Sequence, residues 1–110
     1  MGLTIERMDH PRGLRLSGEL DLASAPALRE ALRLVMSTPG PLTFDLSELE
    51  FIDSTALLVL WEAAAEVAPH GGLTVVDPKP RVRTVLAITG FERAPGVNIV
   101  SRGRAVPPPG

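Results

Sequence analysis

The chain has 110 residues, a formal net charge of −2 at pH 7 and 45% hydrophobic residues, a composition that fits one globular domain. The charge excludes the strong basic field typical of nucleic-acid-binding domains. The absence of cysteine excludes disulfides, thiol nucleophiles and cysteine metal sites. The amino terminus lacks signal-peptide features, and the apolar runs are too short and interrupted to span a bilayer. We therefore expect a cytoplasmic protein that neither binds nucleic acid nor inserts into a membrane.

Two runs of alternating apolar and polar residues open the chain, at Leu3–Met8 and Leu14–Leu20. A turn rich in proline and glycine separates them, and this arrangement predicts a β-hairpin. Ser24 then offers an N-cap, with Pro26 in the first turn of a helix whose apolar residues recur at helical spacing. The Thr-Pro-Gly-Pro segment at 38–41 ends this helix.

Strands and helices alternate after the hairpin. Strands are predicted at Leu42–Leu46, Leu73–Val76 and Val97–Val100, and helices at about Ser54–Val67 and from Pro80 to Gly90. This alternation is typical of an α/β fold in which helices pack on a mostly parallel sheet that begins with the β-hairpin. Residues 1–100 would form this single domain, and residues 101–110 a disordered tail of proline and arginine.

The segment Asp53-Ser54-Thr55 follows a predicted buried strand and begins an apolar helix. All three residue types favour N-cap positions, so a plain helix cap is one interpretation. A phosphorylation site is the other, because the free N–H groups and the positive dipole end of a helix favour an anion. Phosphorylation of Ser54 would add about −1.5 to −2 charges next to any partner surface.

Helical projection of the segment from Ser54 to Val67 places one apolar face against the sheet. The opposite face would hold Thr55, Leu58, Val59, Glu62 and Glu66. Leu58 and Val59 are therefore expected to be exposed close to Ser54, as part of a contact patch. The alternative that another segment of the chain covers them stays open.

Residues typical of catalysis are scarce. Ser54 does not lie in a Gly-x-Ser-x-Gly elbow, and the histidines, His10 and His70, lie in turns beside proline or glycine. No histidine and carboxylate residues occur at metal-binding spacing. We expect no enzymatic activity, no cofactor and no metal.

Three segments resemble a known family: Leu16–Asp21 with its Gly-Glu-Leu-Asp motif, Asp45–Thr55, and Thr89-Gly90-Phe91 after the third predicted helix. Together they resemble the STAS domain family, specifically the bacterial anti-sigma factor antagonists, over about residues 3–100. The Gly-Glu-Leu-Asp and Asp-Ser-Thr motifs are specific in combination, whereas either alone is weak.

The resemblance implies a regulatory cycle. The unphosphorylated protein binds an anti-sigma factor, a serine kinase of the GHKL ATPase type, and thereby frees a sigma factor for transcription. The kinase then phosphorylates Ser54 and the complex dissociates, and a serine phosphatase reverses the modification. The resemblance makes Asp53 the acidic neighbour of the acceptor, Asp21 part of the partner surface and Thr55 a secondary acceptor. Asp21, Asp53, Glu62 and Glu66 would surround the phosphate with like charge.

Two departures from the family pattern have consequences. Ala56 stands where family members commonly have glycine, and its methyl group could hinder a kinase and slow or prevent phosphorylation. Family members usually close with a C-terminal helix, which residues 101–110 do not provide. An alternative function therefore stays open: a non-phosphorylated STAS docking subunit of a stressosome-like assembly or of a bacterial lipid-transport complex.

Overall fold

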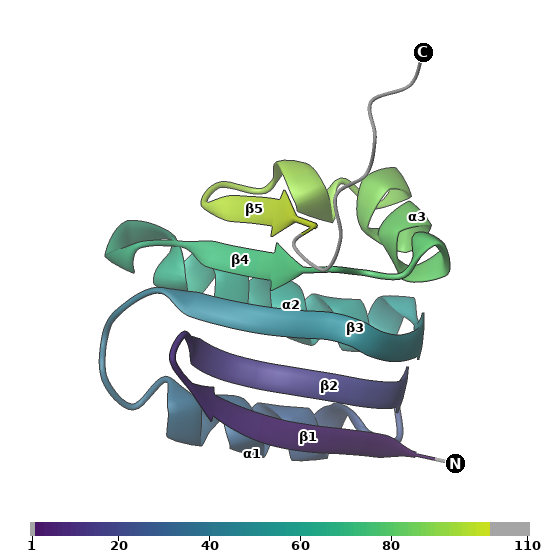
Figure 1. Ribbon diagram of the computed structural model, residues 1–110, viewed down its shortest axis with the longest axis horizontal. Helices are drawn as coiled ribbons and strands as arrows, with labels where there is room; N and C mark the ends of the chain where they lie inside the picture. The colour runs from purple at the N-terminus through teal and green to yellow at the C-terminus, as the bar shows by residue number, and fades with distance from the viewer. Residues whose placement is uncertain (1, 102–110) are drawn as a thin grey trace.

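A five-stranded sheet forms the framework of the protein in the computed structural model, which describes residues 2–101. The strands lie in chain order across the sheet: β1 Leu3–Asp9, β2 Arg12–Leu20, β3 Leu42–Ile52, β4 Leu73–Val76 and β5 Val97–Val100. β1 and β2 pair antiparallel, and every later neighbour pairs parallel (Figure 1). The predicted hairpin and the predicted parallel strands are both confirmed.

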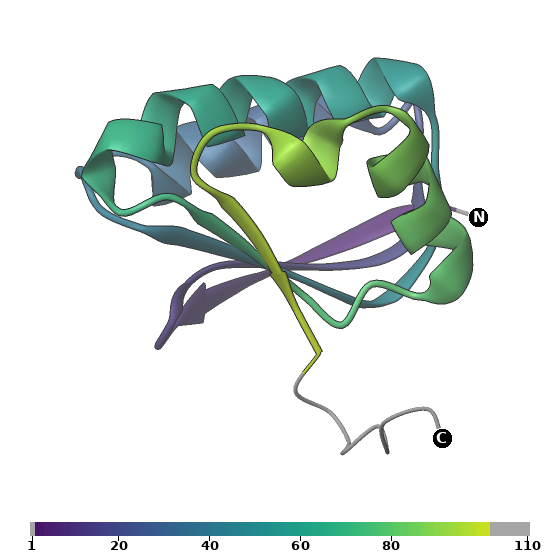
Figure 2. The same ribbon diagram turned by 90° about the horizontal axis from the view of Figure 1, so that it is seen from above.

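The helices connect the parallel strands: α1 Ala25–Val35, α2 Ser54–Val67 and α3 Pro80–Ile88, with short 3-10 turns η1 Ala68–His70 and η2 Phe91–Arg93. All of them lie on one face of the sheet (Figure 2). Each α-helix follows a strand of the parallel part, so the helix N-termini lie at the edge where these strands end. This is the mostly parallel α/β fold that the sequence predicts.

The core fills the space between the sheet and this helix layer. Its largest fully buried side chains come from the strands, α1, α2, α3 and η2: Leu14, Leu16, Leu20, Leu28, Leu42, Phe44, Leu46, Leu49, Leu60, Leu73, Leu86 and Phe91. Trp61 on α2 is partly buried and meets the Phe91 ring edge to face, with ring centroids 5.5 Å apart. This geometry is favourable for aromatic pairs and holds η2, which follows α3, against α2.

The predicted end of the third strand at Leu46 is wrong, because β3 continues to Ile52. Two register shifts against β2 interrupt the alternation of buried and exposed residues in this stretch. The Asp45 carboxylate stabilises the first irregularity by accepting from the backbone N–H of Ser47 at 3.0 Å and from its hydroxyl at 2.7 Å. The extended strand carries the chain directly to Asp53.

The boundary predicted at Ser24 is confirmed, but its role as a side-chain N-cap is wrong. Ser24 has helical backbone angles, so its hydroxyl does not reach the free N–H groups of α1. Instead, the hydroxyl oxygen accepts from the backbone N–H of Asp21 at 2.9 Å. The contact tightens the loop between β2 and α1.

Among the described residues, no helix has the length and apolar character needed to cross a bilayer. Of the tail predicted at 101–110, residues 102–110 lie outside the part of the chain that the structure describes.

Candidate functional site

The ends of β2 and β3 lie side by side at one edge of the sheet. Leu20 pairs with Ile52 at the ends of these parallel strands, and the backbone N–H of Asp53 donates to the carbonyl of Leu20 at 3.1 Å. The loop from β2 to α1 and the entry into α2 are therefore neighbours. The geometry brings together Asp21 and Asp53, two of the sequence-predicted site residues.

Asp53 joins these two segments through both oxygens of its carboxylate. Oδ1 accepts from the backbone N–H of Ala56 at 2.8 Å and caps α2. Oδ2 accepts from the backbone N–H of Leu22 at 3.1 Å and holds the loop between β2 and α1. Charge-assisted hydrogen bonds of this type are stronger than neutral ones. Asp53 therefore positions the site, in addition to being the acidic neighbour of Ser54.

Ser54 is the first residue of α2, and Ser54 and Thr55 are both exposed. Asp53 occupies the Ala56 N–H, while the first N–H groups of a helix have no acceptor within the helix itself. The end of the helix macrodipole adds positive potential at this point. The arrangement leaves the Ser54 side chain accessible at a place that tolerates a negative charge.

The methyl group of Ala56 does not lie on the approach to Ser54. Ala56 is fully buried and belongs to the hydrophobic core beneath the first turn of α2. Asp53 fixes the helix with Ala56 turned inward, so the steric hindrance of a kinase that the sequence suggests has no support in this geometry. Alanine in place of glycine at position 56 therefore adds a methyl group to the core and not to the exposed surface around Ser54.

Asp21 is half-buried in the loop between β2 and α1. Its Oδ1 accepts from the backbone N–H of Ser24 at 3.0 Å and from the Ser24 hydroxyl at 3.1 Å. These bonds make Asp21 part of the structure of the loop, which lies beside the start of α2. Like Asp53, it adds negative charge to this edge of the sheet, while its Oδ1 already accepts from Ser24.

The predicted apolar contact patch requires a correction. Leu58 is 54% exposed, as expected, but Val59 is only 3% exposed. The helical projection considered only the sheet as a packing partner, whereas Val59 also faces α1, where it lines a groove between the two helices. Val59 therefore belongs to the interior of the helix layer.

Leu22 is the apolar residue that sequence reasoning missed. It is 67% exposed in the loop between β2 and α1, and its backbone is tied to Asp53. A single leucine in a polar loop carries no periodic signal, so its exposure could be found only from the structure. The backbone of Leu22 is bonded to Asp53, and Leu58 lies one helical turn after Ser54; we call these two exposed residues the Leu22–Leu58 patch.

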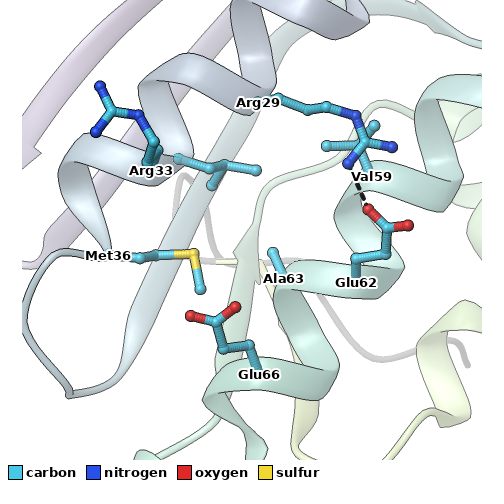
Figure 3. A pocket seen from close by; sticks show the side chains of 8 residues that line it. Arg29, Arg33, Met36, Val59, Glu62, Ala63 and Glu66 are labelled. Carbon is cyan, nitrogen blue, oxygen red and sulfur yellow. Dashed lines mark hydrogen bonds and ion pairs between the residues drawn. The ribbon is translucent and has the colours of Figure 1, made fainter.

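The carboxylates on the outer face of α2 are less concentrated around Ser54 than the sequence suggests. Glu62 pairs with Arg29 of α1, with Nη1 and Oε1 separated by 2.6 Å (Figure 3). Glu66 is exposed a further turn along the helix. The acidic surroundings of Ser54 thus reduce to Asp21 and Asp53, since Arg29 neutralises Glu62 and Glu66 lies far along α2.

Asp45 contributes to the site indirectly, because it stabilises the bulge in β3 and this strand leads to Asp53. Burial raises the pKa of Asp45, but hydrogen bonds from Ser47 and the nearby Arg15 guanidinium outweigh burial and hold this pKa below its ordinary value. The Arg15 Nε lies 3.2 Å from Oδ2. The carboxylate therefore stays ionised and keeps the irregular strand in place.

The described residues contain no group of three or more histidine, cysteine, aspartate or glutamate side chains that could hold a metal ion. His10 is exposed in the turn between β1 and β2, as the sequence predicts, whereas His70 is exposed at the end of η1.

Comparison with known proteins identifies the family. The family model described as "Mlab, STAS domain" matches residues 3–101. A similar curated relative is the anti-sigma-F factor antagonist RsfB of Mycobacterium tuberculosis, 31% identical over 81 residues, which are 73% of this chain and 66% of that protein's length. The anti-sigma-B factor antagonist of Bacillus subtilis is 26% identical over 104 residues, which are 94% of this chain and 95% of that protein.

Solved structures agree with this relationship. An anti-sigma factor antagonist from Mycobacterium paratuberculosis superposes with a TM-score of 0.73 at 30% identity, covering 87% of this chain and 83% of that chain. The unphosphorylated form of the anti-sigma factor antagonist SpoIIAA has a TM-score of 0.68 at 19% identity, covers 90% of this chain and 88% of its own, and supports the fold alone. The chain belongs to the STAS domain family.

Proposed function

We propose that the chain is an anti-sigma factor antagonist whose unphosphorylated form binds an anti-sigma factor of the GHKL serine-kinase type and frees a sigma factor for transcription. One observation carries this proposal: Ser54 is exposed at the capped start of α2, beside the Leu22–Leu58 patch. The names of the relatives, which are antagonists of anti-sigma factors, support the same function.

The Leu22–Leu58 patch supplies the binding energy in this proposal. Leu22 is 67% and Leu58 54% exposed in the free protein. Because full burial of an exposed leucine side chain contributes about 1.5–3 kcal/mol, burial of the remaining surface would contribute roughly half to two thirds of that for each leucine. Asp53 fixes the backbone of Leu22 before the partner arrives, so little conformational entropy is lost there on binding. The partner surface is therefore preorganised by the residue that precedes the phosphate acceptor.

Phosphorylation of Ser54 by the kinase partner would end this interaction, and a serine phosphatase would restore it. The phosphate carries about −1.5 to −2 charges and must be desolvated if the apolar interface is to close over it. The Asp53 carboxylate already accepts from the Ala56 N–H, so it competes with the phosphate for the positive end of α2. A partner surface that fits the uncharged hydroxyl of Ser54 should therefore bind the phosphorylated chain more weakly. Thr55, exposed in the same turn, is the secondary acceptor.

A docking subunit that works without phosphorylation is the second candidate, within a stressosome-like assembly or a bacterial lipid-transport complex. The exposure of Leu22 and Leu58 favours it, because an apolar patch can bind a partner with no switch at all. The buried position of Ala56 removes the steric argument that favoured this candidate.

Incubation of the purified chain with its cognate kinase and ATP separates the two candidates. Intact-mass spectrometry should show one added phosphate on the wild-type chain and none on Ser54→Ala, with Ser54→Thr as the matched hydroxyl control. Addition of phosphate to Ser54→Ala would move the acceptor to Thr55 or another residue, and an unmodified wild-type chain would favour the docking subunit.

We also infer a cytoplasmic binding module without catalysis of its own, and nucleotide or ester hydrolysis by the purified chain would overturn that inference.

A further inference from the structure

A groove of about 350 Å³ opens at the surface between α1 and α2. This volume lies at the lower end of the range found for binding sites in proteins. Arg29, Arg33 and Met36 line it from the α1 side, and Glu62 and Glu66 from α2 (Figure 3). The apolar floor consists of Leu32, Val59 and Ala63. We call this feature the α1–α2 groove; its α2 lining begins at Val59, just after Leu58, and ends at Glu66.

The charges around the α1–α2 groove are not all compensated. Arg29 pairs with Glu62 across the groove, and Arg33 pairs with Glu30 on its own helix. Glu66 forms no ion pair with another of the described residues. Figure 3 shows its carboxylate pointing toward Met36, at the end of the groove opposite Arg29. The groove therefore combines an apolar floor with one carboxylate, that of Glu66, which has no ion pair within the described part of the chain.

The position of Glu66 in α2 is unfavourable for the helix itself. It lies in the last turn, where the macrodipole is negative and where this helix has no basic residue. A carboxylate at a helix C-terminus costs about 0.3–1 kcal/mol. Departures from local helix rules occur mainly where a residue has another role, and a cation from outside the domain would offset this cost.

The exposed face of α3 has the complementary chemistry. Ile88 is 77% exposed, more than Leu22, Leu34, Phe51 or Leu58, the other large exposed hydrophobic residues among those described. Arg81 is exposed and makes no ion pair within the described part of the chain. The two residues are seven positions apart, so they share a helix face and lie about 10 Å apart along its axis.

We propose that the α1–α2 groove binds α3 of a second copy of this chain. Ile88 of the second copy would cover the floor at Val59 and Ala63, and its Arg81 would pair with Glu66. An arginine side chain is long enough to reach from one helical turn to the next, so both contacts can form together. This inference goes beyond the proposed function, because neither surface includes Ser54, Leu22 or Leu58.

The proposed contact predicts how the size of the assembly depends on protein concentration. The groove and the exposed face of α3 are different surfaces of one molecule, so the contact is heterologous and joins copies head to tail. Each added copy still presents one free groove and one free α3. The mass of the assembly should therefore rise with protein concentration.

Sedimentation velocity of the full chain over a wide concentration range tests this proposal. The wild-type chain should associate reversibly, and Glu66→Arg and Ile88→Asp should each weaken association by about tenfold or more, as expected for central interface residues. Leu34→Asp, Glu6→Arg and Ser54→Glu are matched controls on other exposed surfaces and should associate like wild type. Circular dichroism checks that every variant is folded.

The mixture of the two impaired variants is the decisive sample. Glu66→Arg keeps its α3 face and Ile88→Asp keeps its groove, so together they should form a one-to-one dimer that grows no further. Ala63→Leu, which fills the groove without changing charge, should also block association. A wild-type chain that stays monomeric at every concentration would overturn the proposal. So would association that both substitutions leave unchanged, or a mixture that gives no dimer.

Discussion

The two ends of α2 follow opposite rules. At its N-terminus, Asp53 caps the helix and joins it to a neighbouring loop, and the exposed Ser54 lies where negative charge is tolerated. At its C-terminus, Glu66 opposes the helix macrodipole with no ion pair from the described residues. In the proposals above, the first end presents the phosphorylation switch, and the second is completed by a contact from a second copy of the chain.

Asp53→Ala is the strongest way to break this comparison at the N-terminal end. It removes the cap of α2 and the bond to Leu22 together, so the chain should lose about 2–4 kcal/mol of unfolding free energy. Urea denaturation measures this loss. Ser54→Ala is the control and should stay within about 0.5 kcal/mol of wild type. If the two variants were equally stable, Asp53 would have no positioning role.

Replacement of the Leu22–Leu58 patch should separate binding from stability. Leu22→Ala and Leu58→Ala remove exposed apolar surface, so each should weaken binding to the anti-sigma factor about tenfold while leaving the urea midpoint unchanged. Leu34→Ala removes a similarly exposed leucine from α1 and should leave both quantities unchanged. Equal binding by all three variants would place the partner elsewhere.

The pH dependence of stability tests Asp45, which stabilises the irregular part of β3 that leads to the N-terminus of α2. The pKa of Asp45 is lowered in the folded chain, because bonds from Ser47 and Arg15 outweigh the effect of burial. Its stabilisation is therefore complete above the ordinary carboxyl pKa of about 3.9 and is lost as the pH falls toward the lowered value. Asp45→Asn should be less stable at pH 7, and its unfolding free energy should change less between about pH 5 and pH 2. A parallel pH profile for both chains would contradict this assignment.

Glu66→Lys should give the smallest effect, and one of opposite sign. A lysine in the last turn of α2 suits the macrodipole, so thermal unfolding should show a gain of about 0.3–1 kcal/mol. The same variant should associate with itself less than wild type does. Loss of stability instead would mean that Glu66 already has a compensating contact within the domain.

The sequence predicts the elements that follow a regular period. Alternation marks β1 and β2, and helical spacing with the Asp-Ser-Thr start marks α2 at the residues where the structure has it. It does not predict the extension of β3 beyond Leu46, because the bulges at Ser47 and Glu50 disrupt the alternation. The helical period of α2 shows which face packs on the sheet, but not that a second face packs against α1.

The candidate site is divided in the same way. The capped helix start at Asp53 and Ser54 and the exposure of Leu58 follow from local pattern and lie where expected, whereas the choice of Ser54 as acceptor rests on the family resemblance. The burial of Val59 depends on how closely α1 packs against α2, and the exposure of Leu22 depends on a bond across 31 positions of the chain. Contacts between segments distant in sequence decide both, so neither could be predicted from local residue order.

Titration calorimetry of the cognate anti-sigma factor tests the central claim most directly. The titrations compare the chain phosphorylated at Ser54, the unphosphorylated chain and Ser54→Ala. The unphosphorylated chain and Ser54→Ala should bind with similar affinity, and the phosphorylated chain should bind at least about tenfold more weakly, a difference of about 1.4 kcal/mol. Equal affinities for the phosphorylated and unphosphorylated chains would contradict the role of Ser54 as the switch.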